Sequence, residues 1–173
     1  MSLTTEIGSG SSTAESYISE TDADTYHENR GNTVSAAISD KEALLRRATD
    51  FMLQMFRQRW KGYRKTATQS LDWPRSFVYT EPFVHGAVGA YPYLVSDTIV
   101  PTEVKNACAE LALKAYTESL MPDKKQSIKK KVIGPITFEY DQYSKQTKQY
   151  SSIDAMLAPY LNSNGGVSVQ LVK

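Results

Sequence analysis

The 173-residue sequence is poor in the residues from which most catalytic and metal centres are built. It contains two histidines and one cysteine, Cys108. One cysteine excludes an internal disulfide framework, and the set is too small for a zinc site of Cys and His ligands. The sequence has no Gly-x-x-x-x-Gly-Lys-Ser/Thr loop to cradle a nucleotide phosphate. We therefore expect no cofactor, no metal ion and no enzymatic activity.

Long hydrophobic runs are also missing, so the sequence predicts no membrane span, and a basic-then-apolar signal pattern is absent from the first residues. Hydrophobic residues make up 40% of the chain and charged residues 23%, which is ordinary for one globular domain of this length. We expect a single domain over 1–173, with a flexible segment at 1–13, an extended loop arm at 61–100 and a tail at 162–173. We expect it to be made in the cytoplasm.

Positive charge is absent from one end of the chain. Residues 1–29 contain six acidic residues and no Lys or Arg, although the formal net charge of the whole chain is +1. Half of the basic residues fall in two short windows, 57–65 and 124–131. Such blocks are either solvated faces or partner surfaces, and the partner could be nucleic acid or an acidic region of a second copy. The first window provides the candidate interface residues Arg57, Arg59, Lys61 and Arg64.

Apolar periodicity predicts two long helices. Ser39 and Glu42 have the spacing of a capping box, which places a helix start near Asp40 and an end before Gly62. A second helix follows Pro101. Shorter helices are predicted after Ser19 and at 151–157. The apolar faces of the two long helices predict a shared core that contains Leu45, Ala48, Met52, Phe56, Val104, Cys108, Leu111 and Ala115.

The stretch from Gly62 to Val100 lacks helical periodicity and is interrupted by proline and glycine, yet it carries too many aromatic residues for a disordered tract. Either it folds back over its own helices, or it is an arm that docks on a partner. The candidate interface residues on this arm are Trp73, Arg75, Phe77, Tyr79, Phe83, Tyr91 and Tyr93.

A β-hairpin is predicted over Ile128–Tyr140, because apolar and polar residues alternate from Ile136 to Tyr140 and Gly134-Pro135 supplies the turn. Lys129, Lys130 and Lys131 on its first strand either face DNA or protect an edge strand from unwanted pairing. A terminal strand with Val167, Val169 and Leu171 is a further candidate interface. The predicted fold is mainly α: a small helical bundle with a β-hairpin, a long aromatic loop arm and a C-terminal extended strand.

Several short stretches form an ordered set along the chain: Ala14–Ser19 (AESYIS), Ala23–Tyr26 (ADTY), Arg30–Thr33 (RGNT), Arg47–Phe51 (RATDF), Trp60–Gly62 (WKG), Leu71–Arg75 (LDWPR), Ile133–Ile136 (IGPI) and Leu157–Leu161 (LAPYL). Taken together, they resemble a tailed-bacteriophage family whose members are labelled DnaT-like single-stranded-DNA-binding proteins. The similarity covers nearly the whole chain.

The resemblance implies a structural virion protein. As a head–tail connector, or adaptor, it would form a homo-oligomeric ring, a dodecamer matching the portal, in the neck of the virion. Its partners would be the portal protein, a tail or second neck protein, and transiently the DNA in the channel. The alternative is a single-stranded-DNA-binding accessory protein, with the basic runs and aromatics as groove and stacking platforms. Near-neutral net charge counts against that alternative.

Overall fold

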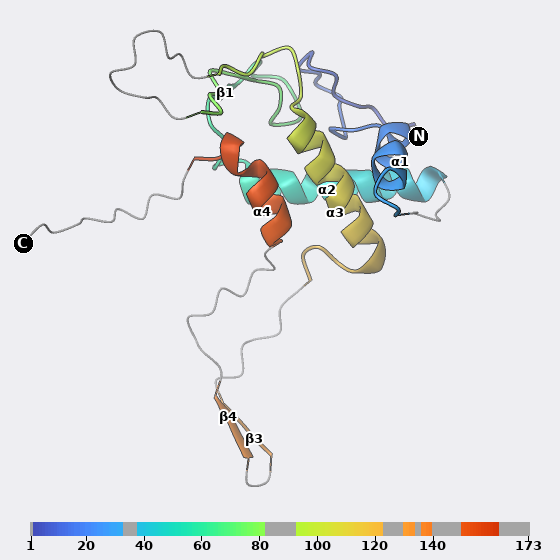
Figure 1. Cartoon of the computed structure of the whole chain (residues 1–173), viewed down its shortest axis with the longest axis vertical. Coiled ribbons are helices and arrows are strands. Elements are labelled where there is room, and N and C mark those ends of the chain that lie inside the picture. The colour runs from blue at the N-terminus through green and yellow to red at the C-terminus, as the bar shows by residue number, and fades with distance from the viewer. Residues whose placement is uncertain are drawn as a thin grey trace, which may run out of the picture.

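The structure is a computed structural model, and it describes residues 2–32, 38–81, 93–122, 130–133, 136–139 and 150–162. The described elements are α1 (Glu20–Glu28), α2 (Ile38–Phe56), β1 (Tyr63–Arg64), β2 (Arg75–Ser76), α3 (Thr102–Thr117), β3 (Lys130–Ile133), β4 (Ile136–Glu139), α4 (Ser151–Leu157) and a 3-10 turn (Ala158–Tyr160). A mainly α fold with a small antiparallel hairpin is therefore confirmed (Figure 1).

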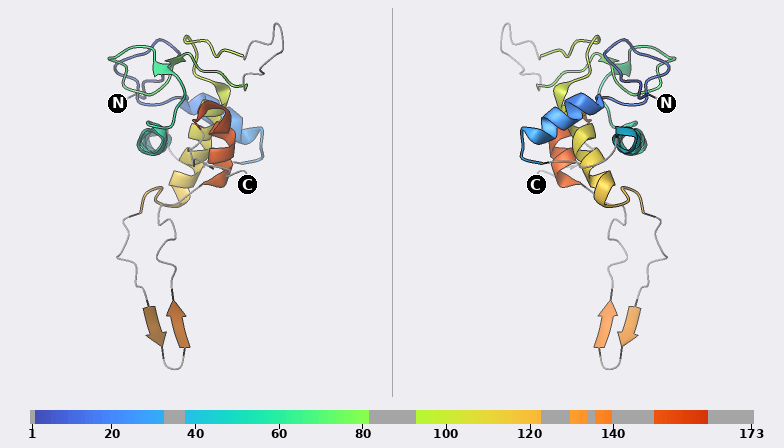
Figure 2. Two further views of the ribbon diagram at one scale, coloured as in Figure 1. Left: turned by 90° about the vertical axis from the view of Figure 1, so that its left-hand side faces the viewer. Right: turned by 90° about the vertical axis from the view of Figure 1, so that its right-hand side faces the viewer.

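Helix α3 is the centre of the helical body. It contacts α1, α2 and α4, and Figure 2 shows it between α2 and α4. Val104, Cys108 and Leu111 on α3 are completely buried, and so is Met52 on the facing side of α2. The many alanines of α3 leave room for the close approach of its neighbours. All eight residues of the predicted helix–helix core are buried, so the periodicity of the sequence identified the core correctly.

The predicted N-terminal cap is present in α1, whereas Glu42 of α2 makes contacts other than the predicted ones. The Ser19 side chain accepts a hydrogen bond from the backbone N–H of Asp22 at 3.1 Å, as the predicted cap of α1 requires. The Glu42 side chain serves a different purpose from the predicted one: its carboxylate accepts from the backbone N–H of Leu3 at 3.0 Å and from Arg46 at 3.5 Å. Glu42 thus ties the N-terminal segment to α2.

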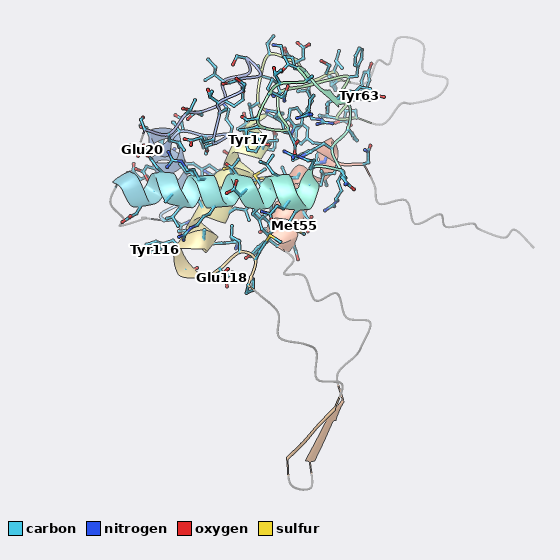
Figure 3. All side chains as sticks on the ribbon, turned by 180° about the vertical axis from the view of Figure 1, so that it is seen from behind. Tyr17, Glu20, Met55, Tyr63, Tyr116 and Glu118 are labelled. Carbon is cyan, nitrogen blue, oxygen red and sulfur yellow. The ribbon has the colours of Figure 1, made fainter. Side chains whose placement is uncertain are left out.

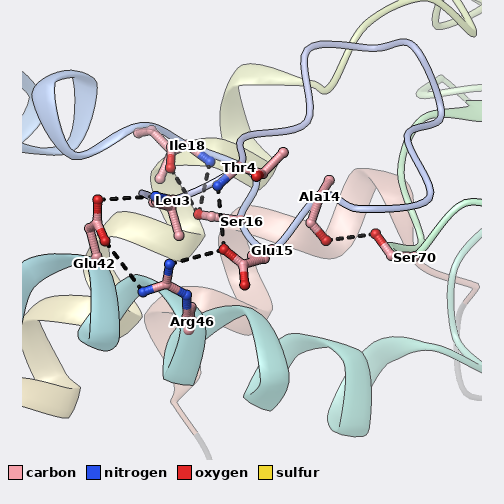
Figure 4. Close-up of polar contacts among 9 residues, drawn as sticks. All are labelled: Leu3, Thr4, Ala14, Glu15, Ser16, Ile18, Glu42, Arg46 and Ser70. Atoms are coloured by element: carbon pink, nitrogen blue, oxygen red, sulfur yellow. Dashed lines mark hydrogen bonds and ion pairs between the residues drawn. The ribbon is translucent and has the colours of Figure 1, made fainter. Parts of the chain in front are cut away.

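The N-terminal segment follows a defined path over the helices (Figure 4). Glu15 and Arg46 form an ion pair at 3.0 Å, and the Ser70 hydroxyl donates to the Ala14 carbonyl at 2.6 Å. The Glu6 carboxylate is buried and accepts from the backbone N–H groups of Gly8, Gly10 and Ser11 at 2.7–3.0 Å. The sequence predicts a flexible linker at 1–13, but this internal carboxylate organises residues 6–11 into a fixed loop.

Replacing Glu6 by alanine is expected to lower the free energy of unfolding by about 1–3 kcal/mol, because one buried and two partly buried N–H groups lose their acceptor. Chemical denaturation followed by circular dichroism measures the loss. Glu15→Gln is the matched control, since its ion pair with Arg46 is solvent-exposed and screened. Equal stability of the Glu6→Ala variant and the wild type would show that the loop does not depend on this carboxylate.

The stretch predicted either to fold back over the helices or to dock on a partner is packed against the body in part. In 61–81 and 93–100 the Trp73 and Val78 side chains have no exposed surface. The Trp73 ring makes edge-to-face contacts with Trp60 and Tyr160, with centroids 5.7 and 5.6 Å apart. Trp73 is therefore a core residue in this chain, and the docking surface predicted for it is corrected. Residues 82–92, including Phe83 and Tyr91, lie outside the described residues.

The predicted hairpin at 128–140 is present as the antiparallel pair β3–β4, with Lys130 opposite Glu139 and Ile133 opposite Ile136. Among the described residues, β3 and β4 contact each other and no other helix or strand. Lys130 and Lys131 lie on β3, and their side chains are outside the description, as is Lys129. Of the 162–173 tail only Asn162 is described, so the predictions for Val167, Val169 and Leu171 are not tested here.

Candidate functional site

A pocket of about 310 Å³ lies beside the short strands β1 and β2, and it is lined by Arg57, Tyr63, Arg64, Asp72 and Arg75. Pairing of Tyr63 with Ser76 and of Arg64 with Arg75 brings the two strands together. Tyr63 is 74% exposed. Figure 3 shows it beyond the end of α2 marked by Met55, on the other side of that helix from Tyr116 and Glu118. We call this the arginine–tyrosine pocket.

Arg75 fastens the pocket to the loop before it. Its Nε and Nη2 donate to the carbonyls of Lys61 and Gly62 at 2.8 and 2.6 Å, and its Nη1 donates to the Asp72 carbonyl at 3.2 Å. Burial lowers the pKa of the Arg75 guanidinium, while the nearby Asp72 charge acts in the opposite direction. Because each of its three guanidinium nitrogens donates to a backbone carbonyl, we assign Arg75 a structural part in the site; the sequence predicted an interface part.

Gly62 allows the two strands to approach each other. Its φ is +65°, and a Cβ at this position would lie 2.2 Å from the Ser76 carbonyl oxygen. Any other residue would push β2 away. The sequence predicted Gly62 as the end of a helix, but α2 already ends at Phe56 and Gly62 directly precedes β1. The close approach of the strands at Gly62 places Arg64 opposite Arg75.

Asp72 is the acidic centre of the pocket. It is 1% exposed, and its Oδ1 accepts from Arg57 Nε at 3.1 Å. Its backbone N–H donates to the hydroxyl of Tyr17 at 3.1 Å; Tyr17 is itself buried, and burial raises the pKa of that phenol. Within the described part of the chain Asp72 Oδ2 has no hydrogen-bond partner. Three guanidinium groups around one carboxylate leave the pocket with two excess positive charges.

The basic run keeps most of its charge uncompensated. Arg57 and Arg59 pair with the carboxylates of Asp72 and Asp154, at 3.1 and 3.3 Å. The side chains of Lys61, Arg64 and Lys65 donate instead to backbone carbonyl oxygens, namely those of Tyr79 and Pro159, of Gln69, and of Gly8. A carbonyl is a neutral acceptor, so these three cations still contribute their full charge to the surface.

Two of the six acidic residues in the N-terminal region pair with basic side chains of the same chain, and a third is buried. Glu6 is buried in its loop, Glu15 pairs with Arg46, and Asp24 pairs with Lys41 at 2.7 Å. Asp22 and Glu28 remain exposed on α1. The broad acidic patch expected from composition is thus reduced to a few side chains, and its attraction for the basic run of another copy is correspondingly weaker.

Most exposed apolar side chains of the described residues belong to the segment that carries the pocket and to residues 93–100. Among the described residues nine large hydrophobic side chains are exposed, and six of these belong to the segments 57–81 and 93–100, which we call the loop cap. The six are Tyr63, Phe77, Tyr79, Tyr93, Leu94 and Ile99. Phe77 is 66% exposed and has a φ of +60°, a conformation that is unfavourable for a bulky residue. A clustering of this kind is typical of binding surfaces.

A wider groove of about 620 Å³ runs between α2 and the end of α3, with Arg47, Asp50 and Tyr116 on its walls. The side chains on its walls carry charges of both signs.

No three His, Cys, Asp or Glu side chains come together as a metal site anywhere in the part of the chain that is described. Within the same residues, no helix is both long and apolar enough to cross a membrane. The arginine–tyrosine pocket is therefore the best candidate site.

Comparison with known proteins gives one match. A family model described as "Putative DnaT-like ssDNA binding protein" matches residues 1–173. The chain belongs to this DnaT-like family. Neither a curated protein nor a solved structure matches it. The match bears out the family part of the sequence resemblance; a place in a phage neck receives no support from it.

Three residues that the sequence predicts as candidate interface residues, Arg57, Arg64 and Arg75, line the pocket of this DnaT-like protein, whereas Tyr63 and Asp72 were not predicted. Tyr63 carries a usable signal, because it stands between glycine and arginine inside a basic run. Asp72 carries no such signal, since its place beside Arg57 depends on the fold. Phe77, Tyr79 and Tyr93 are exposed as predicted, and their part in binding remains a prediction.

Proposed function

We propose that this DnaT-like protein binds single-stranded DNA at the arginine–tyrosine pocket. The observation that carries the proposal is the exposed ring of Tyr63 beside two guanidinium groups at the surface, those of Arg57 and Arg64. Single strands are bound by such a combination: cations contact the phosphates, and aromatic rings stack on bases without regard to sequence. The family description supports the same function.

On this proposal the arginines bind phosphates and the aromatic rings stack on bases. Arg64 uses one nitrogen for the Gln69 carbonyl at 3.3 Å, and Arg57 uses Nε for Asp72, so each retains other N–H groups for phosphate oxygens. Tyr63 offers a face for one base, and Phe77 offers one for a neighbouring base. Binding of this kind involves no catalysed reaction, in keeping with the expectation that the protein is not an enzyme.

The proposal predicts moderate affinity that depends on salt. If two phosphates are contacted through Arg57 and Arg64, counterion release makes the binding constant fall by roughly fivefold to tenfold between about 50 and 200 mM salt. Fluorescence anisotropy with a labelled oligonucleotide of about 12 bases measures this, since one small binding domain covers up to about 16 nucleotides. A duplex of the same length is the control and should bind more weakly, because its stacked bases cannot reach Tyr63.

Two results would exclude the proposal. One is the absence of binding to the single strand at low salt. The other is a duplex affinity equal to the single-strand affinity, since attraction to phosphate alone would then explain the contact.

A second candidate function is that of a head–tail connector, and the exposed apolar side chains of the loop cap favour it. The six exposed apolar side chains of these segments are suited to a protein partner, here the portal or a neighbouring subunit. On this proposal the protein forms a ring in the virion neck. Mass photometry of the purified protein, with and without a portal, tests it. A monomer under both conditions would count against the connector.

A further inference from the structure

We propose that Asp72 makes the arginine–tyrosine pocket selective for bases that carry an amino group. The inference rests on the proposed binding of single-stranded DNA and adds to it a preference for cytosine over uracil or thymine. It starts from Asp72, which lines the pocket and whose buried Oδ2 has no hydrogen-bond partner among the described residues. Buried polar atoms are nearly always hydrogen-bonded, so this oxygen is suited to accept from a donor on a ligand.

The neighbours of Asp72 define what that donor can be. Oδ1 is occupied by Arg57 Nε at 3.1 Å, and the Asp72 carbonyl is occupied by Arg75 Nη1 at 3.2 Å. Among the described residues no hydrogen bond joins Arg75 to Oδ2, and its guanidinium donates instead to the carbonyls of Lys61, Gly62 and Asp72. The acceptor that remains is Oδ2 of Asp72. As a carboxylate oxygen, it accepts a hydrogen bond from an N–H group and repels a carbonyl oxygen.

Cytosine matches this acceptor through its 4-amino group, which is the known partner of acidic side chains in base recognition. Thymine and uracil present O4 at the same place, and their N3–H lies between two carbonyl oxygens that a carboxylate repels. A pocket of about 310 Å³ has the size for a single nucleotide. With its base stacked on Tyr63 and its phosphate on Arg64, the nucleotide would have its amino edge directed toward Asp72.

Admission of the base requires one side chain to move. Oδ2 is closed to solvent in the unliganded protein, whereas the Arg57 side chain is 52% exposed and attached to Asp72 through Nε. Because the guanidinium is planar and rigid, Arg57 must swing as a whole toward a phosphate, which releases Oδ1 and leaves the carboxylate of Asp72 to the incoming base. Arg57 thereby exchanges Asp72 for the phosphate.

The test compares the affinities of oligo-dC and oligo-dU of equal length, which differ at the base edge and share the same backbone and ring size. The wild-type protein should bind oligo-dC about tenfold more tightly, the usual discrimination of one good base contact. Asp72→Asn keeps an acceptor for Arg57 and replaces the second oxygen by a donor. This variant should lose the preference or reverse it in favour of oligo-dU.

Arg64→Ala is the control, and it should weaken both oligonucleotides equally without changing their ratio. Circular dichroism establishes that each variant is folded, and the wild-type ratio remains decisive if Asp72→Asn does not fold. If the wild-type protein binds oligo-dC and oligo-dU with equal affinity, the proposed selectivity is wrong and a water molecule is the partner of Oδ2. The proposal of single-strand binding would be unaffected by that result. No binding of either oligonucleotide would overturn both.

Discussion

A variant that combines Tyr63→Ala with Arg64→Glu is expected to bind single-stranded DNA at least about a hundredfold more weakly than the wild type. Loss of a stacked base costs about 1–3 kcal/mol. The charge reversal removes one phosphate contact and places a carboxylate where the strand passes. Both side chains are exposed, so the variant should retain the wild-type melting temperature. Fluorescence anisotropy at low salt measures the change in affinity.

The matched control moves the same two substitutions to the groove between α2 and α3. Arg47→Glu with Tyr116→Ala changes an exposed arginine and an exposed tyrosine on the other side of α2. The net charge of this control equals that of the test variant, and its affinity for DNA should stay close to that of the wild type. Equal weakening in both variants would mean that total charge, and not the pocket, determines binding.

Met52→Asp is expected to have the largest effect on stability. The Met52 side chain is completely buried between α2 and α3, and an unpaired charge there costs at least about 3 kcal/mol. For a domain of this size such a loss lowers the melting temperature by roughly 10 °C or more. Gln54→Asp adds the same charge at an exposed position of α2 and should change little. A thermal melt of both variants is sufficient, and an unchanged wild-type value for Met52→Asp would refute the helix–helix core.

The helical part of the fold could be predicted because its information is local. Apolar residues at helical spacing in 44–56 and 104–115 identify the faces that meet, and the structure has those residues buried. Alternation after Gly134-Pro135 likewise predicted the β3–β4 hairpin. Each of these signals lies within about two dozen residues and needs no knowledge of the rest of the chain.

The loops could not be predicted in the same way, because their order comes from contacts between distant residues. Trp73 is buried by Trp60 and Tyr160, and Arg75 is held by carbonyls that a sequence pattern does not reveal. An aromatic, proline-rich stretch reads equally well as a docking arm or as a cover. The same holds for the residues around Glu6. Their Gly- and Ser-rich composition suggests a linker, although the Glu6 carboxylate holds them in a defined loop.

The candidate site was predictable only in part, for a related reason. Basic residues at 57–65 point to a charged surface, but the sequence does not say which of them face carboxylates and which face neutral carbonyls. The type of acceptor decides the local charge. The charge of Arg59 is compensated by Asp154, whereas Arg64 donates to a neutral carbonyl and keeps its positive charge. A net charge of +1 for the whole chain therefore understates the positive charge at the arginine–tyrosine pocket.

The central claim is that single-stranded DNA binds at this pocket, and ultraviolet cross-linking followed by peptide mass spectrometry tests it most directly. The wild-type protein, cross-linked to a short oligonucleotide at low salt, should give adducts within residues 57–81, foremost at Tyr63 and Phe77, and the adducts should disappear from the Tyr63→Ala/Arg64→Glu variant. Adducts confined to the peptide that carries Lys129, Lys130 and Lys131, with none in 57–81, would contradict the account.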